Sequence, residues 1–87
     1  MTTSQDIHPA LRERAVAHIL EVANKLGSLE VPLENPDAQS MRIWPDGSFE
    51  MKLHSGETLT VHKQVKELRW EVLTLILSAC ADNGAPL

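Results

Sequence analysis

Residues 41–62, with the sequence MRIWPDGSFEMKLHSGETLTVH, contain the pattern that decides the fold of this chain. Two three-residue turns interrupt the stretch, at Pro45–Gly47 and at His54–Gly56. Each turn ends in a glycine, which can adopt the left-handed conformation that a type I turn followed by a G1 bulge requires. Alternating apolar and polar residues flank both turns. The pattern therefore predicts three antiparallel strands joined as a meander.

The two turns also determine the register of the predicted strands. The first turn places Ile43 opposite Phe49, and the second turn places Phe49 opposite Val61. Both registers put the same apolar side chains on one face of the sheet, although each register is obtained separately. These side chains are Met41, Ile43, Phe49, Met51, Leu53, Leu59 and Val61. One face of the sheet is therefore expected to meet the core, and the other face is expected to meet solvent.

A helix is predicted on each side of the meander. In residues 9–26 apolar side chains recur every three or four positions, Asp6 or His8 is a candidate N-cap, and Gly27 follows the last turn. Residues 63–82 have the same periodicity but lack a capping box at their start. We therefore expect one helix before the sheet and one after it.

Together these elements predict a two-layer α+β fold with the order α-β-β-β-α, in which a three-stranded antiparallel meander of about residues 41–62 packs against an N-terminal and a C-terminal helix. The length supports one domain over residues 1–87, with flexible tails expected at 1–7 and 83–87. Residues 29–33 alternate apolar and polar side chains around a proline. They form either a fourth strand at the edge of the sheet or a plain connection.

The predicted helix at 63–82 is apolar on two sides. One stripe is expected to face the sheet, and a second lobe has no obvious cover in so short a chain. This lobe consists of Trp70, Leu73, Leu77 and Cys80. Either the first helix covers it, or another protein does, or it closes a two-fold homodimer. We predict the homodimer, with these four residues at the interface.

Composition and charge exclude several classes of function. The chain is 43% apolar and 23% charged, which is typical of a soluble globular protein. A net charge of −4 and only three aromatic residues disfavour binding to phosphate backbones and to single-stranded RNA. The longest apolar run, Leu75 to Leu77, is too short for a membrane span, and a single cysteine cannot form an intramolecular disulfide. We expect an acidic, cytoplasmic protein with no membrane partner.

The sequence contains no recognisable catalytic or metal-binding motif. Four histidines are the obvious candidates, but none has the spacing of a zinc site. Cys80 lies on an apolar helix face without a neighbouring cation to activate it. We therefore expect no metal, no cofactor and no enzymatic activity. A site assembled across a dimer interface and an apolar crevice that holds a small ligand between the helices remain as alternatives.

The expected solvent face of the meander carries the best candidates for a binding site. The registers place Trp44, Ser48 and His62 in one row and Arg42 with Glu50 in the next. Tryptophan and arginine are enriched at binding hot spots, so this face is predicted to contact a partner. The predicted partner-binding residues are Arg42, Trp44, Lys52 and His62. The opposing interpretation is a solvated surface with a weak cross-strand ion pair between Arg42 and Glu50.

These observations predict a small non-enzymatic protein–protein interaction module that acts as a homodimer in an accessory, regulatory or inhibitory role. Its protein partner is unknown from the sequence. The alternative function is a nucleic-acid-associated transcriptional regulator that uses the outer face of the meander. The net charge opposes this alternative, although a local basic patch would escape the argument.

Overall fold

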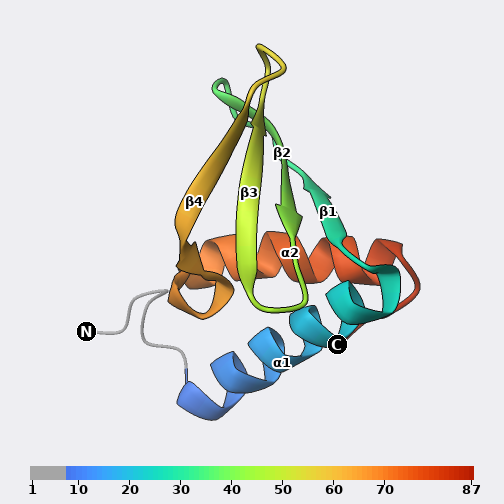
Figure 1. The fold of residues 1–87 in the computed structure, drawn as a ribbon. Helices are drawn as coiled ribbons and strands as arrows, with labels where there is room; N and C mark the ends of the chain where they lie inside the picture. Colours follow the sequence, from blue (N-terminus) through green and yellow to red (C-terminus); the bar gives the residue numbers. More distant parts are fainter. Residues whose placement is uncertain (1–7) are drawn as a thin grey trace.

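A computed structural model describes residues 8–87 of the chain (Figure 1). It confirms the predicted α+β class, with one helix before an antiparallel sheet and one helix after it, but the sheet has four strands instead of three. The elements are α1 (Pro9–Leu26), β1 (Leu29–Pro32), β2 (Ala38–Ile43), β3 (Ser48–Leu53), β4 (Thr58–Gln64), the short 3₁₀ helix η1 (Val65–Glu67) and α2 (Trp70–Asp82).

The additional strand is β1, which pairs antiparallel with β2 at one edge of a sheet with the order β1-β2-β3-β4. It is the alternating segment that the sequence left open between strand and connection. Pro32 ends the strand, and an edge tolerates this proline because it need not donate to a neighbouring strand there. The meander of residues 41–62 thus forms three of the four strands of the sheet.

The predicted registers of the two hairpins are confirmed. Ile43 lies opposite Phe49, and Phe49 lies opposite Val61. One part of the predicted pairing is wrong, because a register shift between Ser48 and Phe49 places Ser48 opposite Gln64. The residues inserted by this bulge remove His62 from the row that it was expected to share with Ser48.

The second helix begins at Trp70, seven residues later than predicted. Residues up to Gln64 extend β4, and Val65–Glu67 form η1. Local hydrogen bonds favour this arrangement, because the Val65 N–H donates to the Gly47 carbonyl (2.9 Å) and the Gln64 N–H donates to the Glu67 carboxylate (2.7 Å). The apolar periodicity of residues 63–69 therefore comes from a strand end and a 3₁₀ turn.

Both helices pack on one face of the sheet, near the end where the turn 45–47 lies (Figure 1). The core at this end joins both helices to β1, β2 and β3, and it contains Ile19, Val22, Leu29, Ile43, Phe49, Leu73 and Ile76. The opposite end of the sheet, which includes the turn 54–56, projects beyond the helices (Figure 1). The helical layer thus covers only part of the inner face.

The face that was predicted to meet the core does face the helices, but only part of it is buried. Met41, Ile43 and Phe49 are buried, whereas Met51, Leu53 and Val61 are partly exposed. Leu59 exposes 51% of its surface, so its expected place in the core is wrong. The cause is the projection of the sheet, because no helix in residues 8–87 reaches this end.

Several polar contacts attach the helices to the rest of the fold. His8 caps α1, with its Nδ1 accepting from the Ala10 N–H (3.1 Å). Arg12 donates to the carbonyls of Lys66 and Leu68, which joins α1 to the segment before α2.

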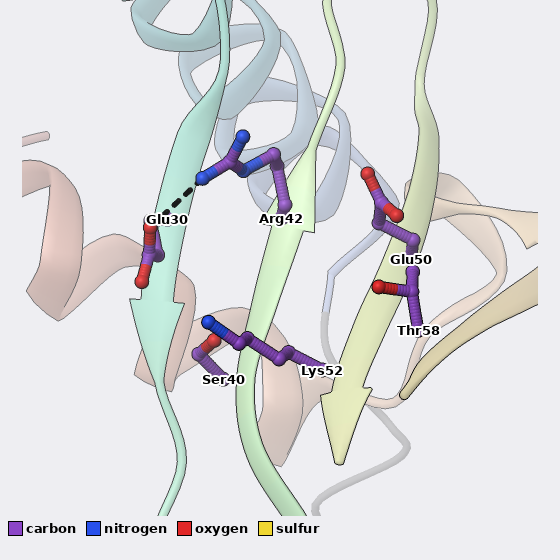
Figure 2. Close-up of a pocket in the computed structure, with 6 residues that line it drawn as sticks. All are labelled: Glu30, Ser40, Arg42, Glu50, Lys52 and Thr58. Carbon is purple, nitrogen blue, oxygen red and sulfur yellow. Dashed lines mark hydrogen bonds and ion pairs between the residues drawn. The ribbon is translucent and has the colours of Figure 1, made fainter. Parts of the chain in front are cut away.

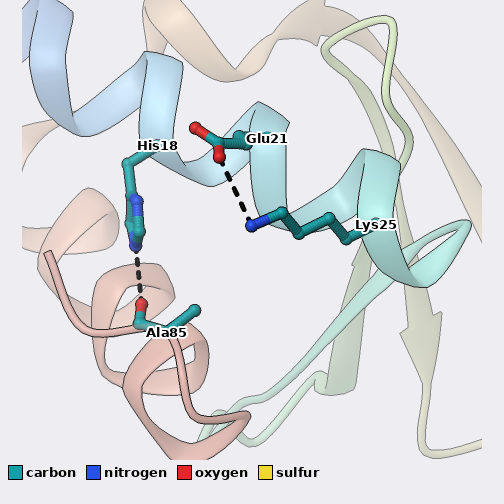
Figure 3. A network of polar contacts seen from close by, with 4 residues as sticks. All are labelled: His18, Glu21, Lys25 and Ala85. Atoms are coloured by element: carbon teal, nitrogen blue, oxygen red, sulfur yellow. Dashed lines mark hydrogen bonds and ion pairs between the residues drawn. The ribbon is translucent and has the colours of Figure 1, made fainter.

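On the same helix, His18 Nε2 lies 2.6 Å from the Ala85 carbonyl oxygen (Figure 3). Ala85 also packs against the core, so the segment 83–87 contacts the fold, while the predicted tail 1–7 lies outside the described residues. Figure 3 also shows the exposed ion pair between Glu21 and Lys25 (3.4 Å). Within the described chain, neither helix has the length and apolarity that a membrane span requires.

Candidate functional site

The outer face of the sheet brings Arg42 and Trp44 together as predicted. The Arg42 guanidinium lies 6.0 Å from the centroid of the Trp44 ring, at the limit of a cation–π contact. The same guanidinium makes an ion pair with Glu30 of β1, with Nη2 3.1 Å from Oε1. The expected pairing of Arg42 with Glu50 is therefore replaced by a pairing with the strand that the meander did not include.

Arg42 and Lys52 share a shallow polar cavity of about 210 Å³ on this face (Figure 2). The residues that line it are Glu30, Ser40, Arg42, Glu50, Lys52 and Thr58. Lys52 extends across β2 toward Ser40 (Figure 2). The lining contains two cationic and two anionic side chains, so their formal charges cancel. The cavity has no net charge with which to attract an anion.

His62 does not join this group. It lies in a separate shallow depression with Ser48, Lys63, Gln64 and Glu67. The register shift between Ser48 and Phe49 explains the separation, because it moves the end of β4 along its neighbour. The structure thus assembles three of the four predicted partner-binding residues, two of them around one cavity.

The four residues predicted for the dimer interface are mostly inside the chain. Leu73 and Cys80 are fully buried in the core, and Trp70 and Leu77 are partly buried against it. Of the three covers considered for this lobe, the structure has the first, because α1 packs against α2. Leu73 and Cys80 therefore have no surface to offer a second copy. Burial also raises the pKa of the Cys80 thiol, which keeps it protonated and unreactive.

The helix stripe that was expected to meet the sheet is buried at Ile76 and Ala79, but it is exposed at Leu75. Leu75 of α2 exposes 54% of its surface and lies beside an apolar groove of about 280 Å³. The groove lies between α2 and the inner face of the sheet, and its lining residues are Leu33, Glu34, Asn35, Met41, Phe49, Met51, Leu68, Val72 and Leu75. We refer to it as the α2 groove. Sequence reasoning missed it because it expected the sheet to cover this whole stripe, Leu75 included.

Three of the four histidines have hydrogen-bond partners that explain their presence. His8 caps α1, and His18 contacts the Ala85 carbonyl. His54 Nε2 lies 2.9 Å from the Asn35 carbonyl oxygen, which joins the turn 54–56 to the connection before β2. Among residues 8–87, His, Cys, Asp and Glu side chains do not gather in any group of three suited to a metal ion.

The chain was also compared with protein-family models, with curated proteins and with solved structures, and none of the three comparisons finds a match.

Proposed function

We propose that this chain is a non-enzymatic protein–protein interaction module that acts as a homodimer, and that the α2 groove receives its protein partner. The observation that carries the proposal is the incomplete cover of the inner face, which leaves Leu75 at the groove half exposed. An apolar groove of this kind is more informative than an isolated exposed leucine, because its lining is contiguous.

The groove is suited to bind a row of apolar side chains on a partner, referred to below as an apolar ridge. Its lining side chains come from three separate parts of the fold, namely the segment after β1, the middle of the sheet and the start of α2. A partner helix that buries one large apolar residue here gains about 2 kcal/mol from the transfer of that residue out of water. Two or three such residues along an amphipathic helix would give a complex of moderate affinity.

The charge at the groove favours a partner with a basic flank. Glu34 is the one charged residue in the lining, and the chain as a whole has a net charge of −4. A lysine or arginine next to the apolar ridge of the partner would meet Glu34, and the overall charge would increase its association rate.

The outer face gives less support to the alternative of a nucleic-acid-associated regulator. Arg42 pairs with Glu30, and Glu50 lines the same cavity. A phosphate group that approached Arg42 and Lys52 would therefore also approach two carboxylates. Counterion release, which provides most of the affinity for a phosphate backbone, requires cations in excess.

Two matched substitutions test the proposal. Leu75→Glu places a charge in the α2 groove, and Leu26→Glu places the same charge at the end of α1, where the leucine is 51% exposed and outside the groove. Tagged natural and variant chains are used for affinity capture from native cells, and captured proteins are quantified by mass spectrometry. We expect a protein enriched by the natural chain and by Leu26→Glu, but lost at least tenfold with Leu75→Glu. The purified protein should then bind the natural chain directly. Equal capture by Leu75→Glu would reject the groove.

A further inference from the structure

The two edges of the sheet differ in how they are protected. The β1 edge is four residues long, ends in Pro32 and contacts both helices. The β4 edge is seven residues long, and β3 is its one hydrogen-bonded neighbour in residues 8–87. It is the edge strand opposite β1 in Figure 1. Natural sheets usually block such an edge with charges, proline, a bulge or a covering element; β4 has Lys63 and a register shift at its end near the helices, whereas residues 58–61 have no charge and no proline.

The backbone of β4 is oriented to accept another strand. In the β3–β4 hairpin the Leu53 N–H donates to the Glu57 carbonyl (2.8 Å). Bonded and non-bonded pairs alternate along an antiparallel ladder, so Leu59 and Val61 are the residues that exchange hydrogen bonds with β3. Thr58 and Thr60, which lie between or beside them, direct their N–H and carbonyl groups to the free edge.

One self-pairing register satisfies both the apolar and the charged side chains. With Thr60 on a two-fold axis, Leu59 lies opposite Val61 of the partner subunit, and Glu57 comes near Lys63 of the partner subunit, which falls within the register shift between Val61 and Gln64. Moving the axis toward Thr58 places Glu57 opposite an apolar residue. Moving it to Val61 places Leu59 opposite Lys63 of the partner subunit, and moving it to His62 places Val61 opposite that lysine. The Thr60 register alone pairs apolar with apolar and acid with base.

The same register also covers an exposed leucine. The strands run antiparallel across the axis, so the end of β4 that lies near the helices in one copy is placed beside the projecting turn 54–56 of the other. Leu59, which is 51% exposed in one copy, then packs beside Val61 of the partner subunit on the inner face. The exposed end of each sheet is thus protected by the second copy.

We propose that two copies of this chain pair through their β4 edges, with Thr60 on the two-fold axis, to form a continuous eight-stranded sheet. The inference rests on the homodimer of the proposed function and specifies its interface. It leaves the α2 groove of each copy free for the other protein.

The first test uses charge exchange, because the natural pairs occur twice in a symmetric dimer. Sedimentation equilibrium of the natural chain is expected to show a dimer at tens of micromolar. Glu57→Lys and Lys63→Glu should each weaken dimerisation about tenfold, since each creates two like-charged pairs. The double variant restores both pairs and should restore the dissociation constant. Asp37→Lys, directly before β2, is the control for net charge and should have no comparable effect.

The second test locates the axis. Thr60→Cys places two thiols on the axis, where paired Cα atoms lie about 5.5 Å apart, and mild oxidation should give a covalent dimer. The natural chain is the control, because its Cys80 is buried. Thr60→Pro removes an N–H that β3 does not use, so it should give a folded monomer by circular dichroism and sedimentation.

A monomeric natural chain would reject both this interface and the homodimer of the proposed function. A dimer that tolerates Thr60→Pro, shows no restoration in the double charge variant and does not cross-link at position 60 would reject the β4 interface alone.

Discussion

The two ends of the sheet have the same alternating sequence pattern but very different surroundings. At the helix-covered end, near the turn 45–47, Ile43 and Phe49 are enclosed by side chains of both helices. At the projecting end, near the turn 54–56, Leu59 on the same face is half exposed. Alternation in a strand therefore indicates which face is apolar, but the reach of the helices decides which apolar residues form the core. The covered end holds the buried core, and the projecting end leaves the apolar side chain of Leu59 exposed.

The largest expected difference between the two ends is in the cost of removing an apolar side chain. Ile43→Ala should lower the free energy of unfolding by about 3 to 4 kcal/mol, because the side chain is fully buried and its neighbours cannot fill the cavity. Leu59→Ala should cost about 1 kcal/mol or less within one copy, because half of this side chain already contacts water.

Urea denaturation of both variants at a concentration low enough to keep the chain monomeric checks this difference. Equal losses in the free energy of unfolding for Ile43→Ala and Leu59→Ala would mean that the projecting end is covered in solution and that the two ends do not differ.

The turns provide the second contrast. Gly47 and Gly56 both have positive φ values, +92° and +94°, so an alanine at either position is strained by about 1 to 2 kcal/mol. At Gly56 a new Cβ meets open space, whereas at Gly47 it overlaps the Gln64 side chain, which must move. We expect Gly47→Ala to cost about 1 kcal/mol more than Gly56→Ala in thermal or urea unfolding. A larger loss at Gly56 would contradict the difference in packing between the two ends.

The sequence predicted the parts of the fold that depend on local chemistry. The two glycine turns determined both hairpin registers, and His8 and Gly27 correctly bounded α1. The errors arose where distant contacts decide the outcome. Residues 63–69 have helical periodicity. The hydrogen bond from Val65 to Gly47, together with the strand residues of β4 that precede Val65, favours a strand end and a 3₁₀ turn instead.

The candidate site was less predictable for the same reason. Trp44 directly follows the end of β2 and lies two residues after Arg42, so their proximity follows from the alternation of side chains along an extended chain. The partner of Arg42 is Glu30, which lies on a strand that the sequence left undecided. The α2 groove depends on how much of the apolar side of α2 the sheet covers, and the apolar pattern of the helix does not reveal that Leu75 stays exposed.

The smallest expected effect distinguishes the two turns by pH. The Asp46 carboxylate accepts from the Ser48 hydroxyl (2.6 Å) and from the Ser48 N–H (2.9 Å), and these bonds hold the pKa of Asp46 below its ordinary value of 3.8. At the other turn a neutral group, the Ser55 hydroxyl, accepts from the Glu57 N–H (3.4 Å). Of the two turns, only the one at 45–47 should therefore make the stability of the fold depend on pH in the acidic range.

The direction of this pH dependence follows from the linkage between proton binding and folding. A carboxylate with a lower pKa in the folded chain stabilises the fold above the unfolded pKa, and this contribution decreases as the pH falls through the folded pKa. The difference in melting temperature between the natural chain and Asp46→Asn should thus be constant above about pH 5 and should shrink below 3.8. Ser55→Ala is the matched control, and its difference from the natural chain should not change over the same range. If the difference in melting temperature from the natural chain depends on pH in the same way for Asp46→Asn and Ser55→Ala, the Asp46 carboxylate does not stabilise the turn 45–47, and the two turns are chemically equivalent.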